Sequence, residues 1–198
     1  MTETRRGRPR SFDRDAALEQ ALLTFWERGY DATSVADLTA ALGIGAPSLY
    51  AAFGDKQKLF EEVVVRYQET RGAWTARALA EEPTARAAIT RILREAAVEY
   101  TATDHAQGCL IISAAQNTIP ASAEVADHLR RLRQANVIAF RDRIQADVDA
   151  GVLPKTTDAD GLATYFAATI QGMSQQARDG ATQAQLTRVA ELAAAVWR

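Results

Sequence analysis

Residues 34–56 carry four hydroxyl groups and one ammonium group, and three of the hydroxyls together with the ammonium could bind the oxygens of phosphate groups. Ser34 and Lys56 each stand near the expected start of a helix, where unpaired backbone N–H groups favour anions. Ser48 and Tyr50 lie between them. The tyrosine offers a hydroxyl to a phosphate and a ring to a sugar or a thymine methyl group. Such residues suit the recognition of a phosphate backbone.

Two short helices and one longer helix must position these groups. Residues 34–42 begin with a capping box, in which Ser34 caps the helix and Asp37 reaches back, and they end at a Gly-Ile-Gly turn. Residues 47–53 begin with Pro47, which suits a first helical turn. A longer helix that begins near Asp13 and ends near Gly29 precedes both and carries an apolar stripe.

This arrangement predicts a helix-turn-helix, whose second helix enters the DNA major groove while the first braces it. On that second helix, Leu49 and Phe53 face inward at helical spacing, which turns Ala46, Ser48 and Tyr50 outward. An ordinary helical corner with incidental polar residues is the alternative that periodicity leaves open.

The first 12 residues predict a basic flexible arm. The segment "TETRRGRPRS" carries Arg6, Arg8 and Arg10 around a glycine and a proline, and it cannot bury apolar surface. A solubilising tail is the alternative for this segment.

Other chemistry finds little support in the sequence. The chain has 198 residues, 47% of them hydrophobic, and a formal net charge of −2, so its bulk charge does not indicate nucleic-acid binding. Cys109 is the single cysteine, and His105 and His128 lie far apart, so we expect no disulfide, no metal ion and no cofactor. No paired carboxylates, Ser/His/Asp set or phosphate-binding loop is evident, which disfavours an enzyme.

We also expect a cytoplasmic protein that has no membrane partner. No apolar run approaches the roughly 20 residues that a membrane-spanning helix needs. The basic N-terminus is not followed by the apolar segment of a signal peptide.

The whole chain predicts an all-α fold of about nine helices, because apolar residues recur at helical spacing and strand-like alternation is nearly absent. We expect a three-helix head over residues 13–56 and a larger helical body over residues 57–198. A fourth helix links them and runs from Leu59 past Tyr67 toward Trp74 and Leu79. The last helix begins at Thr182.

The stretch "ALLTFWERGYDATSVADLTAALGIGAPSLYAAFGDKQKLFEEVV", residues 21–64, resembles the DNA-binding region of the TetR family of transcriptional regulators. Three parts match in order and spacing: "FWERGYDATSVADL", "GIGAPSLYAAF" and "DKQKLF". The resemblance covers about the first third of the chain. The body resembles the family's usual architecture, although its sequence is less diagnostic.

The resemblance implies which residues contact DNA. Phosphate contacts are implied for Thr33, Ser34, Tyr50 and Lys56, and groove or base-edge contacts for Ala46, Pro47, Ser48 and Tyr50. The arm would reach the adjacent minor groove through its arginines. The outward positions Gly45, Ala46 and Pro47 are small and apolar, so specificity would rest on methyl contacts, DNA shape and the arm.

The resemblance also implies an inducer pocket in the body and a homodimer formed by the last two helices. Apolar walls with a few polar groups suit a small ligand, and the pocket candidates are Tyr67, Trp74, Tyr100, Cys109, Ile112, Gln116, Phe140, Tyr165 and Gln171. Apolar stripes on the last two helices are the candidates for the dimer interface: Leu162, Phe166, Ile170, Met173, Leu186, Val189, Leu192 and Val196. Plain core packing is the alternative for single members of both sets.

These features together predict a ligand-responsive regulator that binds a pseudo-palindromic operator in double-stranded DNA and is released by a small-molecule inducer. Repression is favoured, and activation stays open. The rival functions are a ligand-independent architectural DNA-binding protein and a helical enzyme. The inducer, the operator, the regulated genes and a redox role for Cys109 are not readable from the sequence.

Overall fold

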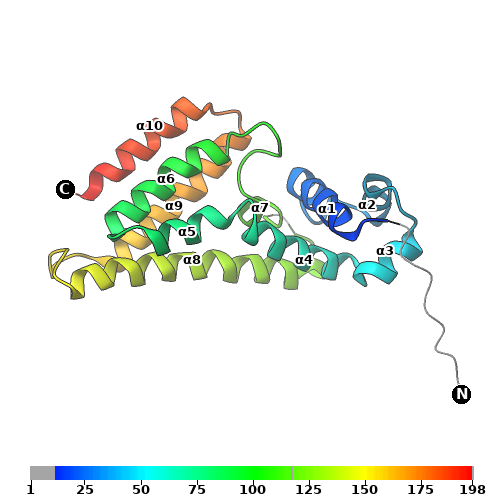
Figure 1. Ribbon diagram of the computed structural model, residues 1–198, viewed down its shortest axis with the longest axis horizontal. Coiled ribbons are helices and arrows are strands. Elements are labelled where there is room, and N and C mark those ends of the chain that lie inside the picture. The colour runs from blue at the N-terminus through cyan, green and yellow to red at the C-terminus, as the bar shows by residue number, and fades with distance from the viewer. Residues whose placement is uncertain (1–11, 117, 198) are drawn as a thin grey trace, which may run out of the picture.

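The computed structural model describes residues 12–116 and 118–197, in which every regular element is a helix (Figure 1). The all-α prediction is therefore confirmed for this part of the chain. The elements are α1 (Arg14–Arg28), α2 (Val35–Leu42), α3 (Ala46–Phe53), α4 (Lys56–Glu69), α5 (Ala73–Glu81), α6 (Ala85–Glu99), α7 (Leu110–Ser113), α8 (Ala123–Asp149), α9 (Ala159–Arg178) and α10 (Gln183–Ala194), with short 3-10 helices η1 (Pro120–Ser122) and η2 (Ala195–Trp197).

The predicted fourth helix is in fact two helices. α4 ends at Glu69, and α5 begins at Ala73 after a turn that contains Gly72. The N–H of Gly72 donates to the carbonyl of Tyr67 at 2.7 Å, and a Cβ at position 72 would lie 2.8 Å from the Tyr67 ring. The turn therefore requires glycine because the backbone passes directly over a buried tyrosine.

The head consists of α1, α2 and α3 and lies at one end of an elongated molecule (Figure 1). Its link to the body is α4, which packs along α1 and continues away from α3. Phe25 of α1 and Phe60 of α4 are fully buried and meet edge to face, with ring centroids 5.0 Å apart. This aromatic contact makes α4 part of the head's core as well as its connection to the body.

The body is built from two closely packed helix pairs. α6 packs against α10, and the long α8 lies beneath and packs along α9 (Figure 1). Ile89, Leu93 and Phe166 are fully buried between these helices. Asp147 of α8 is also buried, where it accepts a hydrogen bond from the N–H of Ala85 at 2.7 Å and pairs with Arg143. The α6 start is thereby fixed to α8.

Hydrogen bonds join the head to the body in addition to α4. The N–H of Tyr30 donates to the carbonyl of Ala114, just after α7, at 2.7 Å. The Asp31 carboxylate accepts from the N–H of Ile119 at 2.9 Å and from the Ser122 hydroxyl at 2.5 Å. The α1–α2 loop is thus attached to the segment between α7 and α8.

Within the described residues, no single helix is both long and apolar enough to cross a membrane. Only α2 and α3 taken together reach the required length and apolarity, and they meet at a bend of 93°.

Candidate nucleic-acid interface and ligand pocket

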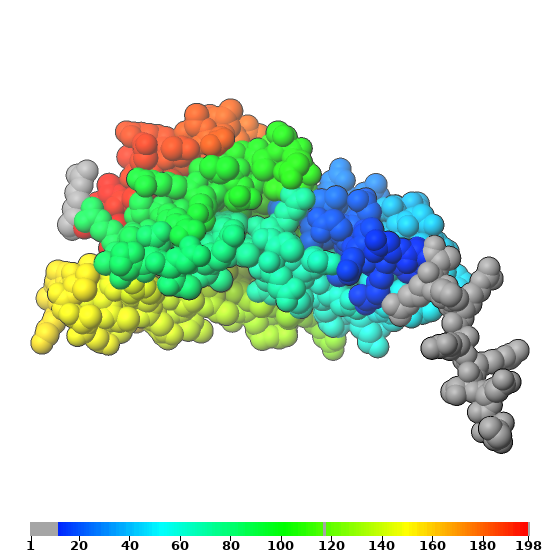
Figure 2. Space-filling view, viewed as in Figure 1, coloured from blue at the N-terminus to red at the C-terminus, as the bar shows by residue number. Residues whose placement is uncertain are grey.

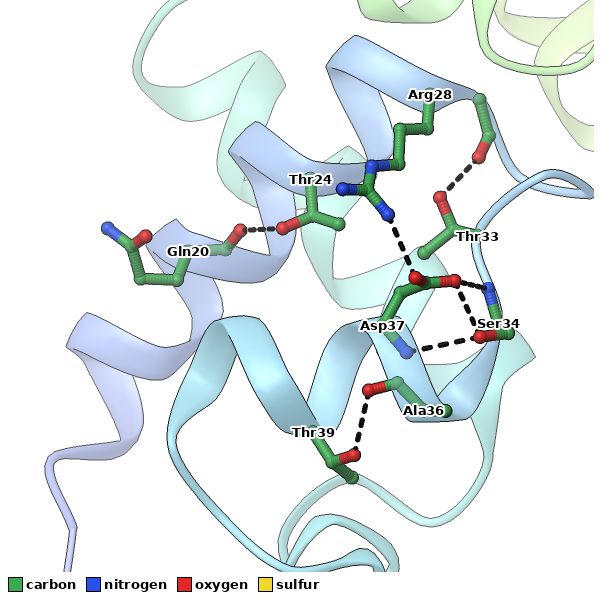
Figure 3. Close-up of polar contacts among 9 residues, drawn as sticks. Gln20, Thr24, Arg28, Thr33, Ser34, Ala36, Asp37 and Thr39 are labelled. Atoms are coloured by element: carbon green, nitrogen blue, oxygen red, sulfur yellow. Dashed lines mark hydrogen bonds and ion pairs between the residues drawn. The ribbon is translucent and has the colours of Figure 1, made fainter.

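The start of α2 is held by a complete capping box, as predicted (Figure 3). The Ser34 hydroxyl accepts from the Asp37 N–H at 3.1 Å, and the Asp37 carboxylate accepts from the Ser34 N–H at 2.8 Å. Arg28 adds an ion pair to Asp37 at 2.9 Å. The hydrogen bonds from Ser34, followed by the charge of Arg28, lower the pKa of the Asp37 carboxyl. The exposed helix that braces α3 is therefore tied to α1.

The turn between α2 and α3 depends on Gly43, whose φ of 64° lies in the left-handed region. Its N–H donates to the carbonyl of Ala40, and the next N–H, of Ile44, donates to the carbonyl of Thr39 at 3.2 Å. Any other residue would be strained in this conformation, apart from the occasional Asn or Asp. The turn sets the two short helices nearly perpendicular, at 93°.

α3 presents one buried and one exposed face. Leu49 is fully buried and Phe53 is 3% exposed, whereas Tyr50 is 48% exposed and Ser48 is also exposed. Pro47 occupies the first turn, as expected. Two hydroxyl groups therefore project from a helix that is anchored on both sides of Tyr50, which is the geometry that groove contact requires.

One expected phosphate contact requires correction, and a second stays a prediction. Thr33 is fully buried, and its hydroxyl donates to the carbonyl of Gly29 at 2.7 Å (Figure 3), so it closes the end of α1 instead of facing a ligand. The Lys56 ammonium lies 4.2 Å from the centre of the Tyr30 ring, and burial lowers its pKa. This contact places the Lys56 ammonium beside the Tyr30 ring, and a phosphate contact from Lys56 stays a prediction.

The remaining DNA-binding candidates differ in exposure. Ser34 is exposed and Ala46 is half-buried, so Ser34 is accessible and Ala46 only in part. Lys58, which the sequence analysis missed, carries an exposed ammonium near the start of α4, 3.9 Å from Asp55. Its spacing of two residues from Lys56 was the available signal. Arg6, Arg8 and Arg10 lie outside the described residues.

A cavity of about 150 Å³ lies in the body among α4, α5, α7, α8 and α9. Seven of the nine pocket candidates line it: Tyr67, Trp74, Tyr100, Cys109, Ile112, Phe140 and Gln171. The other two do not, because Gln116 is exposed beyond α7 and Tyr165 is 42% exposed on the outer face of α9. The space-filling view shows the elongated outline of the molecule, with the head at one end and the body at the other (Figure 2).

Cys109 is held inside this cavity by hydrogen bonds. The Tyr67 hydroxyl donates to its Sγ at 3.2 Å, and its own N–H donates to the Ser174 hydroxyl at 2.9 Å. Burial raises the pKa of the Cys109 thiol, and burial also raises the pKa of the Tyr67 and Tyr100 hydroxyls. All three groups are therefore neutral at pH 7, and the thiol has no thiolate character.

Comparison with known proteins identifies the family. Residues 17–63 match the family model described as "Bacterial regulatory proteins, tetR family", and residues 87–193 match that of the "Tetracyclin repressor-like, C-terminal domain". The chain belongs to the TetR family. This confirms the resemblance seen in the sequence and makes the protein a transcriptional regulator rather than an enzyme.

Relatives of this TetR-family protein match over nearly its whole length. The HTH-type transcriptional repressor ComR of Escherichia coli (strain K12) is 36% identical over 196 residues, 97% of this chain and 92% of that protein. The HTH-type transcriptional repressor BdcR of the same organism is 29% identical over 187 residues, 94% of this chain and 90% of that protein. A cysteine mutant of the TetR family transcriptional regulator CifR, solved in complex with a 26-bp double-strand operator DNA, has a TM-score of 0.93 and 39% identity, covering 96% of this chain and 100% of that chain.

The residues predicted for the dimer interface of this TetR-family chain form two sets, which differ in burial. Four members, Phe166, Ile170, Met173 and Leu186, are buried in the chain's own core, and Ile170 lines the cavity. They cannot offer an exposed apolar surface, so their assignment to the interface was wrong. Leu162 is half-buried, whereas Val189, Leu192 and Val196 are 38%, 60% and 45% exposed. Tyr165 belongs with the exposed set.

Four polar residues of the cavity were missed in the sequence: Gln68, Thr75, Arg133 and Asn136. Of these, Arg133 and Asn136 lie on α8. They precede Phe140 by seven and four positions and therefore share its helix face. The spacing was the available signal, but a charged residue on a long helix is usually solvent-facing.

Proposed function

We propose that this protein is a repressor that binds a pseudo-palindromic operator as a homodimer and is released by a small molecule bound in its body. The observation that carries the proposal is the pair of exposed hydroxyls, Ser48 and Tyr50, on a helix whose Leu49 and Phe53 are buried. ComR and BdcR are named as repressors, and CifR was solved with operator DNA. These names support repression through DNA binding.

Sequence selection by this surface depends on small contacts. The exposed side chains of α3 include Pro47, Ser48 and Tyr50 and no Arg, Asn or Gln, so bidentate hydrogen bonds to a base edge are not available from this helix. We therefore assign selectivity to contacts with thymine methyl groups and to DNA shape, and we assign part of it to the N-terminal arm.

The proposed dimer uses the outer faces of α9 and α10. Apolar surface is exposed by Tyr165 on α9, by Val189 and Leu192 on the adjacent α10, and by Val196 on η2, which follows α10. A symmetric dimer would cover this surface and would present two copies of α3 to a two-fold DNA site.

The proposed release mechanism runs through α7. This helix begins after Cys109, in the cavity wall, and ends just before Ala114, whose carbonyl accepts a hydrogen bond from the N–H of Tyr30 in the head. A ligand that displaces Cys109 or Ile112 would move α7 and with it the α1–α2 loop, and α4 would tilt as part of the same core. A coupling of about 1–3 kcal/mol would change operator affinity by about 5–150-fold.

Selection of binding sites from a random pool of duplex DNA, at 150 mM salt, tests the proposal. A repressor should enrich an inverted repeat whose half-sites are spaced by whole helical turns. Enrichment of no common sequence would instead indicate an architectural DNA-binding protein, whose affinity depends on phosphate contacts alone.

A further inference from the structure

We propose that the cavity in the body binds a small organic anion, and that Arg133 pairs with its carboxylate while the apolar part of the ligand occupies the aromatic walls. The inference rests on the proposed function, because it names the chemical class of the inducer.

Arg133 is a half-buried cation with an incomplete set of partners. It lies on α8 in the cavity wall, and its Nη1 donates to the carbonyl of Ile111 at 2.8 Å. In the described part of the chain it forms no ion pair. Burial lowers the pKa of its guanidinium, and the positive charge of Arg130 lowers it further.

The other half-buried arginines that the structure describes are paired with carboxylates. Arg71 has carboxylates at 2.6 and 3.6 Å, and Arg91 has three within 2.7–3.0 Å. Shielding a charge from water is costly unless an opposite charge compensates it. Arg133 departs from this pattern at the wall of a cavity, so the compensating charge is expected from the occupant. A cationic ligand would be repelled.

The rest of the cavity defines the other part of the ligand. Its walls are formed by Trp74, Tyr100, Phe140, Ile112 and Leu132, with Trp74 and Tyr100 packed edge to face at 5.9 Å. A cavity of about 150 Å³ has the size that holds one benzene ring. The guanidinium prefers the two coplanar oxygens of a carboxylate, with which it forms two parallel hydrogen bonds. The ligand class is therefore a carboxylate on a single aromatic ring or a short branched chain.

Paired acids and amides test this assignment, because each pair differs in charge but hardly in shape. We would measure binding of benzoate, phenylacetate and 3-methylbutanoate, and of their three neutral amides, by isothermal titration calorimetry on the full chain at pH 7.5. At least one acid should bind about tenfold or more tightly than its amide. If no acid is preferred over its amide, the assignment is overturned.

Variants test whether Arg133 is the residue that makes the cavity prefer acids over amides. Arg133→Gln should lose about tenfold or more of acid affinity while changing amide affinity little. Arg130→Gln, on the same helix but exposed and paired with Asp127, should leave both unchanged. An acid preference that survives in Arg133→Gln would overturn the role of this residue. If that variant does not fold, Arg133→Lys retains the charge and should retain the preference.

Operator binding without ligand separates this inference from the proposed function. A protein that selects an operator but prefers no acid contradicts the ligand class alone. A protein that prefers acids through Arg133 but selects no operator contradicts the proposed function alone.

Discussion

Asp31 lies in the loop between α1 and α2, and its carboxylate attaches the head to the body. It accepts one hydrogen bond from the Ile119 N–H at 2.9 Å and another from the Ser122 hydroxyl at 2.5 Å. Asp31→Ala removes both acceptors and leaves an N–H and a hydroxyl without their protein partner. Hydrogen bonds to a charged group contribute about 1.5–3 kcal/mol each when shielded. Because Asp31 is only half-buried, we expect about 1–3 kcal/mol in total.

Calorimetric unfolding measures this effect. For a chain of this length, each kcal/mol corresponds to about 2–4 °C in Tm, so Asp31→Ala should lower Tm by about 2–12 °C. Hydrogen exchange at the Ile119 amide should also accelerate, because that N–H loses its acceptor. Asp31→Asn keeps one acceptor oxygen, so its Tm should lie between that of the unchanged protein and that of Asp31→Ala.

Asp142→Ala is the matched control. Asp142 is exposed and pairs with its neighbour Arg141 at 2.7 Å, so its loss should change stability by less than about 0.5 kcal/mol. Equal Tm changes for the two alanine variants, with unchanged exchange at Ile119, would refute the argument that the Asp31 carboxylate holds the head to the body.

Three further predictions concern the dimer, the recognition helix and pH. Val189→Asp on α10 should convert the dimer to monomers in sedimentation velocity. The control Val152→Asp, at a similarly exposed position near the α8–α9 loop, should leave the dimer intact. A Val189→Asp protein that stays dimeric would contradict the proposed interface. Leu49→Ala should destabilise the protein by about 2–5 kcal/mol in urea unfolding, because the side chain is fully buried; a change below about 1 kcal/mol would contradict the packing of α3. The lowered pKa of Asp37 stabilises the fold above the ordinary carboxyl pKa of about 4, and this contribution is lost as pH falls through the folded value. Carboxyl ¹³C NMR should show the Asp37 pKa rising in a Ser34→Ala variant, and an unchanged titration would remove the capping box as its cause.

The head was largely predictable from the sequence because its boundaries depend on local signals. Asp13 and Ser34 cap α1 and α2 through their own next turn, and Gly43 supplies the one left-handed residue of the turn. These interactions span at most a few residues, so the residue types and spacing are sufficient to predict them.

The errors arose where distant parts of the chain decide the outcome. The break after α4 depends on the packing of Gly72 over Tyr67, and periodicity alone does not reveal it. α9 is apolar on more than one face, and its contacts with α6, α8 and α10 determine which face is core. Phe166 and Ile170 could not be separated from interface residues without those contacts.

The central claim is that α3 lies in the major groove of DNA, and methylation protection on the selected operator tests it most directly. Dimethyl sulfate modifies guanine N7, which is exposed in the major groove. The structure predicts two protected clusters on one face of the duplex, about 34 Å or a multiple apart. It also predicts that Tyr50→Ala weakens both clusters together. Bound protein that leaves every guanine N7 reactive, or protection that Tyr50→Ala does not change, would contradict the account.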